Sequence, residues 1–275
     1  MVAKKPIGVF DSGIGGLTVF KAIAGKLPHY DYMYFGDNKR APYGNRSFNT
    51  IHEYTWQCVQ WLFEQGCPLV VLACNTASAK ALRTIQQHDL GSKYADRRVL
   101  GVIRPTAEVI GNYSTTKQIG VLGTTGTIQS ESYLIEINKF FPDLKVYQQA
   151  CPLWVPLIEN GEYNKPGADY FVQLYLDQIM AQSPGIDTLL LACTHYPLLQ
   201  SRIKAHLPEG INVVTQGDIV ANSLAAYLGR HPEIESKITK TGTREFFTTT
   251  DDTREFDKHA AIFFPDDVRS NFVEM

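Results

Sequence analysis

The sequence has little net charge, no long apolar run and no apolar leader segment. Lys and Arg number 26 and Asp and Glu 28, which gives a formal net charge of −2. This balance gives no reason to expect nucleic acid or an anionic membrane as a main partner. No apolar run is long enough to span a bilayer as a helix. Residues 1–6 lead directly into the apolar Ile7–Phe10 run without a signal-peptide pattern, so we expect a cytoplasmic protein.

Cysteines are few and have no framework spacing. Their odd number argues against a disulfide framework, and no pair has the C-x-x-C spacing of a structural zinc site. We therefore expect free thiols and no metal site. The five cysteines are Cys58, Cys67, Cys74, Cys151 and Cys193.

Recognisable cofactor motifs are also missing. The glycine-rich stretch Asp11 to Leu17 follows an apolar run, but no Gly-Lys-Ser/Thr follows it, and its glycine spacing differs from G-x-G-x-x-G. No lysine lies in a pyridoxal phosphate motif. The stretch predicts a tight strand-to-helix turn, with Asp11 either as a simple cap or as part of a site. We expect no cofactor.

Two copies of one short pattern dominate what is present. Leu69–Thr76 and Thr188–His195 are each an apolar run that ends in Ala-Cys and small polar residues. Such runs are typical of buried parallel strands. Cys74 and Cys193 therefore lie at carboxyl ends of strands, where open α/β sheets bind their ligands. Each precedes a predicted helix, whose N-terminus is expected to lower the thiol pKa.

A second repeat supports two related halves. The Ile7–Gly13 pattern returns at Ile119, 112 positions later, and the two cysteine motifs lie 119 positions apart. The sequence therefore predicts an α/β fold built from two similar halves with mainly parallel sheets. Further strands are expected at 32–35, 99–103, 144–148, 186–192, 213–214, 245–249 and 268–273, and helices at 47–65, 77–87, 130–140, 165–182, 219–228 and 254–262.

Two equivalent thiols favour a particular kind of chemistry. A hydrolase needs only one nucleophile, and a redox dithiol needs adjacent sulfurs, which sequence separation does not exclude. Inversion at a carbon stereocentre uses two equivalent acid/base groups, one on each face. A thiol with a pKa of ~8.5 can serve as either acid or base. Hydroxyls of Ser12, Thr76 and Thr194 could orient the substrate.

Several motifs together resemble the glutamate racemase family, over about Ile7 to Phe264. They are Asp11-Ser12-Gly13-x-Gly15-Gly16, Pro42-Tyr43-Gly44, Ala73–Ala79, Val155-Pro156-Leu157-x-Glu159 and Cys193–Leu199. The resemblance implies cofactor-independent conversion of L-glutamate to D-glutamate for peptidoglycan. It also implies two flavodoxin-like domains, residues 1–99 plus 210–275 and residues 100–209, with the active site in the cleft between them, and a homodimer.

The resemblance also implies site residues. Cys74 deprotonates the D-isomer and Cys193 the L-isomer, and Asp11, Glu159 and His195 assist. The implied substrate-binding residues are Asp11, Ser12, Tyr43, Gly44, Asn75, Thr76, Thr124, Thr125, Thr194 and His195.

Two alternatives remain open at this point. Aspartate racemases share the two-thiol plan, and a non-catalytic binding role, such as gyrase inhibition, would keep the fold without turnover. Thr215–Gly217 and Arg104 depart from the family pattern, so dimer mode and effector regulation stay open.

Overall fold

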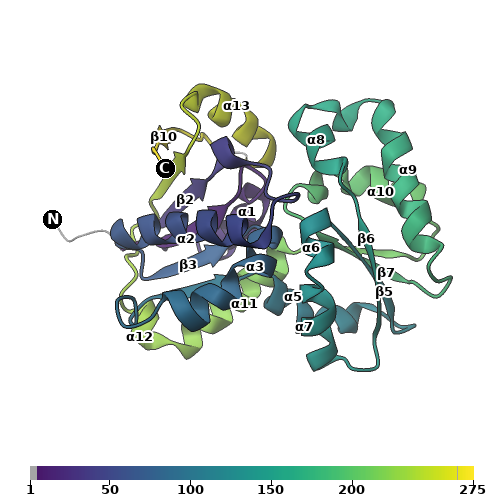
Figure 1. Ribbon diagram of the computed structural model, residues 1–275, viewed down its shortest axis with the longest axis horizontal. Helices are drawn as coiled ribbons and strands as arrows, with labels where there is room; N and C mark the ends of the chain where they lie inside the picture. Colours follow the sequence, from purple (N-terminus) through teal and green to yellow (C-terminus); the bar gives the residue numbers. More distant parts are fainter. Residues whose placement is uncertain (1–4, 265) are drawn as a thin grey trace.

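Two parallel sheets lie side by side in the computed structural model, which describes residues 5–264 and 266–275 (Figure 1). The first sheet has six strands in the order β10-β9-β2-β1-β3-β4, and the second has four in the order β6-β5-β7-β8. Every strand pair is parallel. The predicted fold class, two similar α/β halves with parallel sheets, is confirmed.

The strands of the first sheet are β1 (Ile7–Asp11), β2 (Tyr32–Gly36), β3 (Leu69–Leu72), β4 (Arg98–Gly101), β9 (Arg244–Thr248) and β10 (Ser270–Phe272). Those of the second are β5 (Gln118–Gly123), β6 (Lys145–Ala150), β7 (Thr188–Ala192) and β8 (Asn212–Val214). We call the six-stranded sheet and its helices the first lobe, and the four-stranded sheet and its helices the second lobe.

The helices of the first lobe are α1 (Leu17–Lys26), α2 (Phe48–Glu64), α3 (Asn75–Lys80), α4 (Leu82–Thr84), α11 (Gly217–Arg230), α12 (Pro232–Glu235) and α13 (Thr253–Phe263). Those of the second lobe are α5 (Ile103–Ala107), α6 (Thr125–Gln129), α7 (Ser132–Phe140), α8 (Trp154–Glu159), α9 (Gly167–Met180) and α10 (Gln200–His206). Within the part of the chain that the structure describes, none of the helices combines the length and apolar character needed to cross a bilayer.

The two sheets repeat one strand order. Counted along the chain, the first four strands of each lobe lie in the order second, first, third, fourth. This is the order of the flavodoxin-like open sheet. Cys74 follows β3 and Cys193 follows β7, each the third strand of its lobe. The two thiols therefore occupy equivalent positions.

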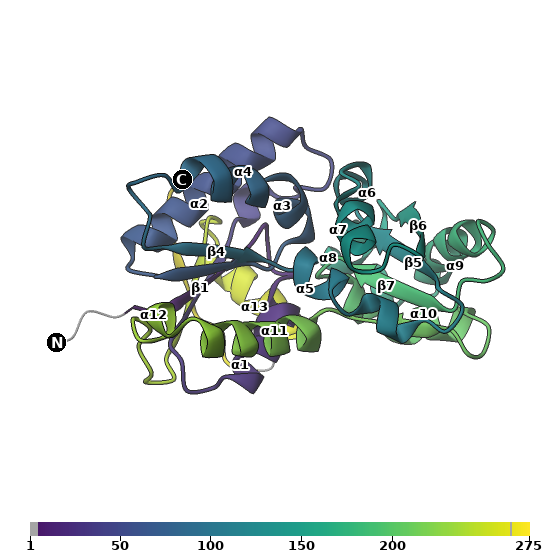
Figure 2. The ribbon, with the colours of Figure 1, turned by 90° about the horizontal axis from the view of Figure 1, so that it is seen from below.

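Helices cover both faces of the first sheet, with α2, α3 and α4 on one side and α1, α11 and α13 on the other (Figure 2). Successive residues of β1 show both cores. Val9 belongs to the cluster that includes Phe20 of α1, while Phe10 belongs to the cluster that includes Val59 of α2. Because both faces are buried, the strand reads as an uninterrupted apolar run.

The chain crosses between the lobes twice, after β4 and after β8. β8 pairs with β7, so the second sheet extends to Val214. The crossings therefore fall near Val102 and Gln216, close to the domain limits inferred from the sequence. Those limits, 1–99 with 210–275 and 100–209, stay a prediction.

Two expected helices are interrupted. The segment predicted as one helix over 77–87 is divided into α3, α4 and a π-helical turn at Ile85–Asp89. The helix predicted over 130–140 begins only at Ser132, because Glu131 is left-handed, with φ 54°. The Ser130 hydroxyl donates to Thr127 O and accepts from the Ser132 N–H, which replaces helical backbone bonds at this point.

Candidate active site

The carboxyl ends of β1 and β3 place Asp11 and Cys74 side by side. These strands are direct neighbours in the sheet. The Cys74 thiol donates to Ser12 Oγ at 3.4 Å and accepts from the Ala77 N–H at 3.4 Å, so it caps the N-terminus of α3. The first lobe thus brings together three residues that the sequence singled out.

The surroundings of Cys74 differ from the expectation for a helix cap. Burial and the nearby Asp11 carboxylate raise the pKa of the Cys74 thiol to about 12, although Ser12 and the Ala77 N–H oppose this shift. The Ala77 N–H at the helix N-terminus does lower the pKa, but the expected net lowering is wrong, because burial outweighs both hydrogen bonds. Cys74 is held here as a neutral thiol.

Asp11 is fully buried, and one of its two carboxylate oxygens lacks a hydrogen-bond donor among the described residues. Its Oδ2 accepts from the Gly13 N–H at 3.0 Å, while Oδ1 has no hydrogen-bond partner among the described residues. Burial raises the pKa of Asp11, and His195 and nearby backbone N–H groups lower it in part. A buried oxygen without a donor is costly, and a ligand cation would satisfy it.

The second lobe contributes three side chains in contact with one another, those of Cys193, His195 and Glu159. Cys193 Sγ lies 4.0 Å from His195 Nδ1, and His195 Nε2 lies 3.0 Å from Glu159 Oε1. Burial lowers the pKa of His195, but the hydrogen bonds to Cys193 and Glu159 outweigh it and raise the pKa to about 10. His195 is therefore an imidazolium at neutral pH, between a thiol and a carboxylate.

One close approach joins the two sets. A Cβ on Gly15 would lie 2.3 Å from His195 Nδ1 and 2.6 Å from Thr194 Oγ1. Only glycine lets the turn after β1 approach the segment after β7 so closely. Cys193 also contributes to the raised pKa of Cys74, so the two thiols lie within electrostatic reach of each other.

Polar contacts continue across the lobes around this centre. Thr76 Oγ1 lies 3.0 Å from Thr124 Oγ1. The Thr18 hydroxyl donates to Thr194 O at 2.8 Å. The Gly126 N–H donates to Gly44 O at 2.8 Å. Hydrogen bonds between the lobes therefore surround the site.

Comparison with known protein families identifies the family of the chain. Residues 17–224 match the model of the family described as Asp/Glu/Hydantoin racemase. The chain belongs to this racemase family.

Named members of this racemase family are similar to the chain over almost its whole length. A glutamate racemase of Sulfurihydrogenibium is 43% identical, over 92% of this chain and 91% of its own. The crystal structure of glutamate racemase RacE1 from Bacillus anthracis has a TM-score of 0.89 at 32% identity, covering 99% and 98% of the two chains. That of the Francisella tularensis glutamate racemase, in complex with D-glutamate, has a TM-score of 0.87 at 30% identity, covering 99% and 98%.

The remaining predicted residues of the racemase site are less uniform. The buried Tyr43 hydroxyl donates to Asp37, so any ligand contact of Tyr43 would use its backbone. Gly44 is half-buried and faces Thr124, toward whose Cβ a Gly44 Cβ would lie at 3.1 Å. Thr125 is half-buried at the start of α6. The structure thus adds no direct tie from Thr125 to the thiols.

Sequence reasoning missed three residues that surround Asn75 and Thr76. Asn75 Nδ2 donates to Gln216 Oε1 at 2.7 Å, and the Tyr133 hydroxyl donates to Asn75 Oδ1 at 2.5 Å. Thr127 Oγ1 lies 3.4 Å from Thr76 Oγ1. The departure of Thr215–Gly217 from the family pattern was the only signal for Gln216, and Tyr133 and Thr127 had none.

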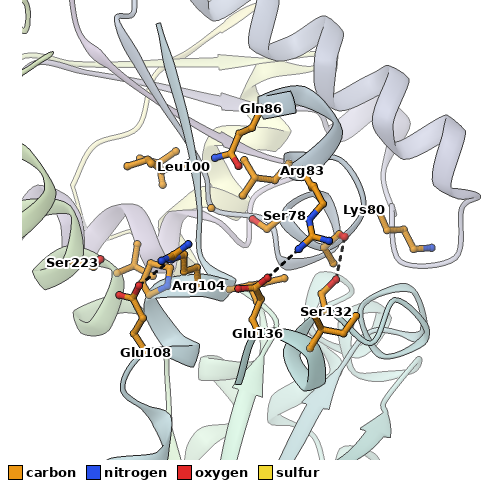
Figure 3. Close-up of a pocket in the computed structure, with 18 of the residues that line it drawn as sticks. Ser78, Lys80, Arg83, Gln86, Leu100, Arg104, Glu108, Ser132, Glu136 and Ser223 are labelled. Atoms are coloured by element: carbon orange, nitrogen blue, oxygen red, sulfur yellow. Dashed lines mark hydrogen bonds and ion pairs between the residues drawn. The ribbon is translucent and has the colours of Figure 1, made fainter. Parts of the chain in front are cut away.

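One cavity borders this arrangement, and a larger one lies apart from it. The smaller, of about 320 Å³, includes Ile14, Pro42 and Glu159 in its wall, so it opens beside the His195 partner. The larger, of about 780 Å³, lies at the seam of the lobes, where Arg83 pairs with Glu136 and Arg104 with Glu108 (Figure 3).

The larger cavity contains none of the predicted site residues, so we place the active site at the thiols and not there. Across residues 5–264 and 266–275, no three His, Cys, Asp or Glu side chains converge in a way that could hold a metal ion.

Proposed function

We propose that the chain interconverts L- and D-glutamate by proton transfer at Cα between Cys74 and Cys193, without a cofactor. The observation that carries the proposal is the equivalent placement of two buried thiols after the third strand of each sheet, with the Gly15 turn in contact with His195. The relatives named glutamate racemase over most of the chain support the substrate.

In the direction from L to D, Cys193 is the base. The His195 imidazolium lies 4.0 Å from its sulfur, and Glu159 holds that imidazolium in place. Breaking the Cα–H bond forms a Cys193 S–H bond and leaves the electron pair on the substrate. The neutral Cys74 thiol then gives its proton to the opposite face of Cα, and the atoms balance without oxidation or reduction.

In the direction from D to L, Cys74 must first become the base. The Asp11 carboxylate opposes this because its charge raises the pKa of Cys74. A substrate ammonium at Asp11 Oδ1 would neutralise that charge and remove part of the barrier. Hydroxyls of Ser12, Thr76 and Thr194, with the amide of Asn75, would orient the carboxylates.

The proposal also covers the biological role of the reaction and the oligomeric state of the enzyme. The D-glutamate would supply peptidoglycan synthesis in the cytoplasm, and the active form would be a homodimer. Light scattering of the purified chain measures the second point directly, and a monomer at working concentration would contradict it.

Isotope incorporation tests the reaction. Single enantiomers of glutamate and of aspartate are incubated with the protein in deuterated water, without pyridoxal phosphate. We expect loss of optical rotation and of the α-proton signal for glutamate. Preference for aspartate would show that aspartate is the substrate instead of glutamate. Inertness toward both would contradict an enzymatic role and support a binding role.

Substitution of each thiol tests the mechanism. Cys74→Ser and Cys193→Ser should each lower the rate of racemisation by about 10²–10⁴-fold, the usual contribution of a positioned acid or base. Cys67→Ser, at a buried thiol that precedes β3 and so lies at the opposite end of this strand from Cys74, is the matched control and should keep near-normal turnover. Near-full activity in either active-site variant would contradict the two-thiol mechanism.

A further inference from the structure

A closed ring of buried hydrogen bonds lies next to Cys74. Asn75 Nδ2 donates to Gln216 Oε1 at 2.7 Å, Gln216 Nε2 donates to the Tyr133 hydroxyl at 2.6 Å, and that hydroxyl donates to Asn75 Oδ1 at 2.5 Å. Each member gives one hydrogen bond to the next. All three are almost fully buried, so no solvent competes for these bonds.

An anchor outside the ring sets its direction. Gln216 Nε2 also donates to Thr106 Oγ1 at 2.9 Å, and the Thr106 hydroxyl donates to Val102 O at 2.8 Å. Since the Thr106 proton is committed to a carbonyl, this hydroxyl can only accept from Gln216. The amide nitrogen of Gln216 is therefore fixed toward Thr106 and Tyr133, and its oxygen toward Asn75.

This orientation of the Gln216 amide leaves one N–H group of the Asn75 amide unused by the ring. The ring uses both the oxygen of the Asn75 amide and one of its two N–H groups. The second N–H of Nδ2 has no acceptor among the described residues, and Asn75 directly follows Cys74. It is a pre-oriented donor directly beside Cys74.

We propose that Gln216 is a positioning residue, which holds the Asn75 amide with this N–H toward a carboxylate of the substrate. The inference rests on the proposed function. It also links the orientation of the Asn75 amide to the arrangement of the lobes. Thr106 and Gln216 lie beside the two chain crossings, and Tyr133 belongs to α7 of the second lobe. A change in lobe closure would move the donor.

Gln216→Met tests this role, since methionine keeps the length of the side chain and removes its hydrogen bonds. We expect the KM for both glutamate enantiomers to rise about tenfold, equivalent to ~1.4 kcal/mol of binding, with kcat within about threefold. Tyr133→Phe opens the same ring and should raise KM in the same direction. The double variant should be no worse than the more severe single one, because one ring is broken once.

A matched control separates positioning from stability. Thr188→Val removes a buried hydroxyl bond to Tyr113 O at the opposite end of β7 from Cys193. It should lower Tm without changing KM. If Gln216→Met does not fold, Thr106→Val removes the anchor alone and should also raise KM.

An unchanged KM in soluble Gln216 and Tyr133 variants would overturn the inference, provided that the unmodified chain racemises glutamate. A chain inert toward glutamate would instead overturn the proposed function.

Discussion

Cys74 and Cys193 occupy equivalent strand ends but have unlike neighbours. Cys74 lies beside the buried Asp11 carboxylate and a serine hydroxyl, whereas Cys193 lies beside the His195 imidazolium. The first setting favours a neutral thiol at Cys74, whereas the second places a cation beside Cys193. Pseudo-symmetry of the backbone therefore does not extend to the charges around the two thiols.

Removing the Glu159 charge should shift the pH profile. The hydrogen bonds to Cys193 and Glu159 raise the pKa of His195 to about 10 against the burial that lowers it, so Glu159→Gln should lower that pKa. The alkaline limb of kcat/KM for L-glutamate should then begin at lower pH. Glu162→Gln, at an exposed ion pair with Lys165, is the control and should leave the profile unchanged.

The same group affects stability, with a defined sign. Because the folded state raises the pKa of His195 above its usual 6.5, its protonation stabilises the fold fully below that value. The contribution is lost as pH rises through about 10. Urea unfolding across this range should show a smaller alkaline loss in Glu159→Gln, and an equal loss in both proteins would contradict the assignment.

At the scale of elements, the turn between β1 and α1 determines how closely the lobes meet. Gly15→Ala would place a Cβ 2.3 Å from His195 Nδ1, so the turn or the imidazole must move. A displacement of about 1 Å at a reacting centre can cost about a hundredfold in rate. We expect a loss of that order in kcat for racemisation, measured by circular dichroism.

Gly25→Ala is the matched control for this prediction. Gly25 lies within α1, and a Cβ there would meet nothing within 4 Å. Alanine should therefore stabilise the helix by about 0.5–1 kcal/mol and leave the rate unchanged. Equal rates in both glycine variants would show that the Gly15 contact is not needed.

Elements with strong apolar runs were predictable, and contacts between distant elements were not. The runs before Cys74 and Cys193 predicted buried strands because parallel strands covered on both faces contain few polar residues. The division of α6 from α7 depends on one hydroxyl, that of Ser130, which competes with backbone bonds. The ring at Gln216 joins residues 58 to 141 positions apart, separations that no local pattern encodes.

At the scale of the whole molecule, the C-terminal segment completes the first sheet, and Asp31 fastens it. Asp31 Oδ1 accepts from the Thr241 N–H, the Thr241 hydroxyl and the Thr243 N–H at 2.7–2.9 Å. Burial alone would raise the pKa of Asp31, yet these bonds lower it well below its usual value. A lowered pKa gives stability that is present above pH 3.8 and lost as pH falls further.

Asp31→Asn should therefore destabilise the chain by about 1–3 kcal/mol at pH 7, the cost of weakening bonds to a buried acceptor. The difference from the unmodified chain should shrink below about pH 4, where Asp31 becomes protonated in the unfolded chain while it stays ionised in the folded one. Chemical denaturation at several pH values measures both. Asp143→Asn, at an exposed carboxylate, should change stability by less than about 0.5 kcal/mol.

The nesting of one sheet inside the sequence of the other affects how the protein is made. The strands of the second sheet fall within residues 118–214, whereas the first sheet draws on residues 7–101 and again on 244–272. Domains form as units while a nascent chain leaves the ribosome. The inner lobe can thus assemble during translation, before the ribosome has made the residues of β9 and β10 that complete the outer sheet.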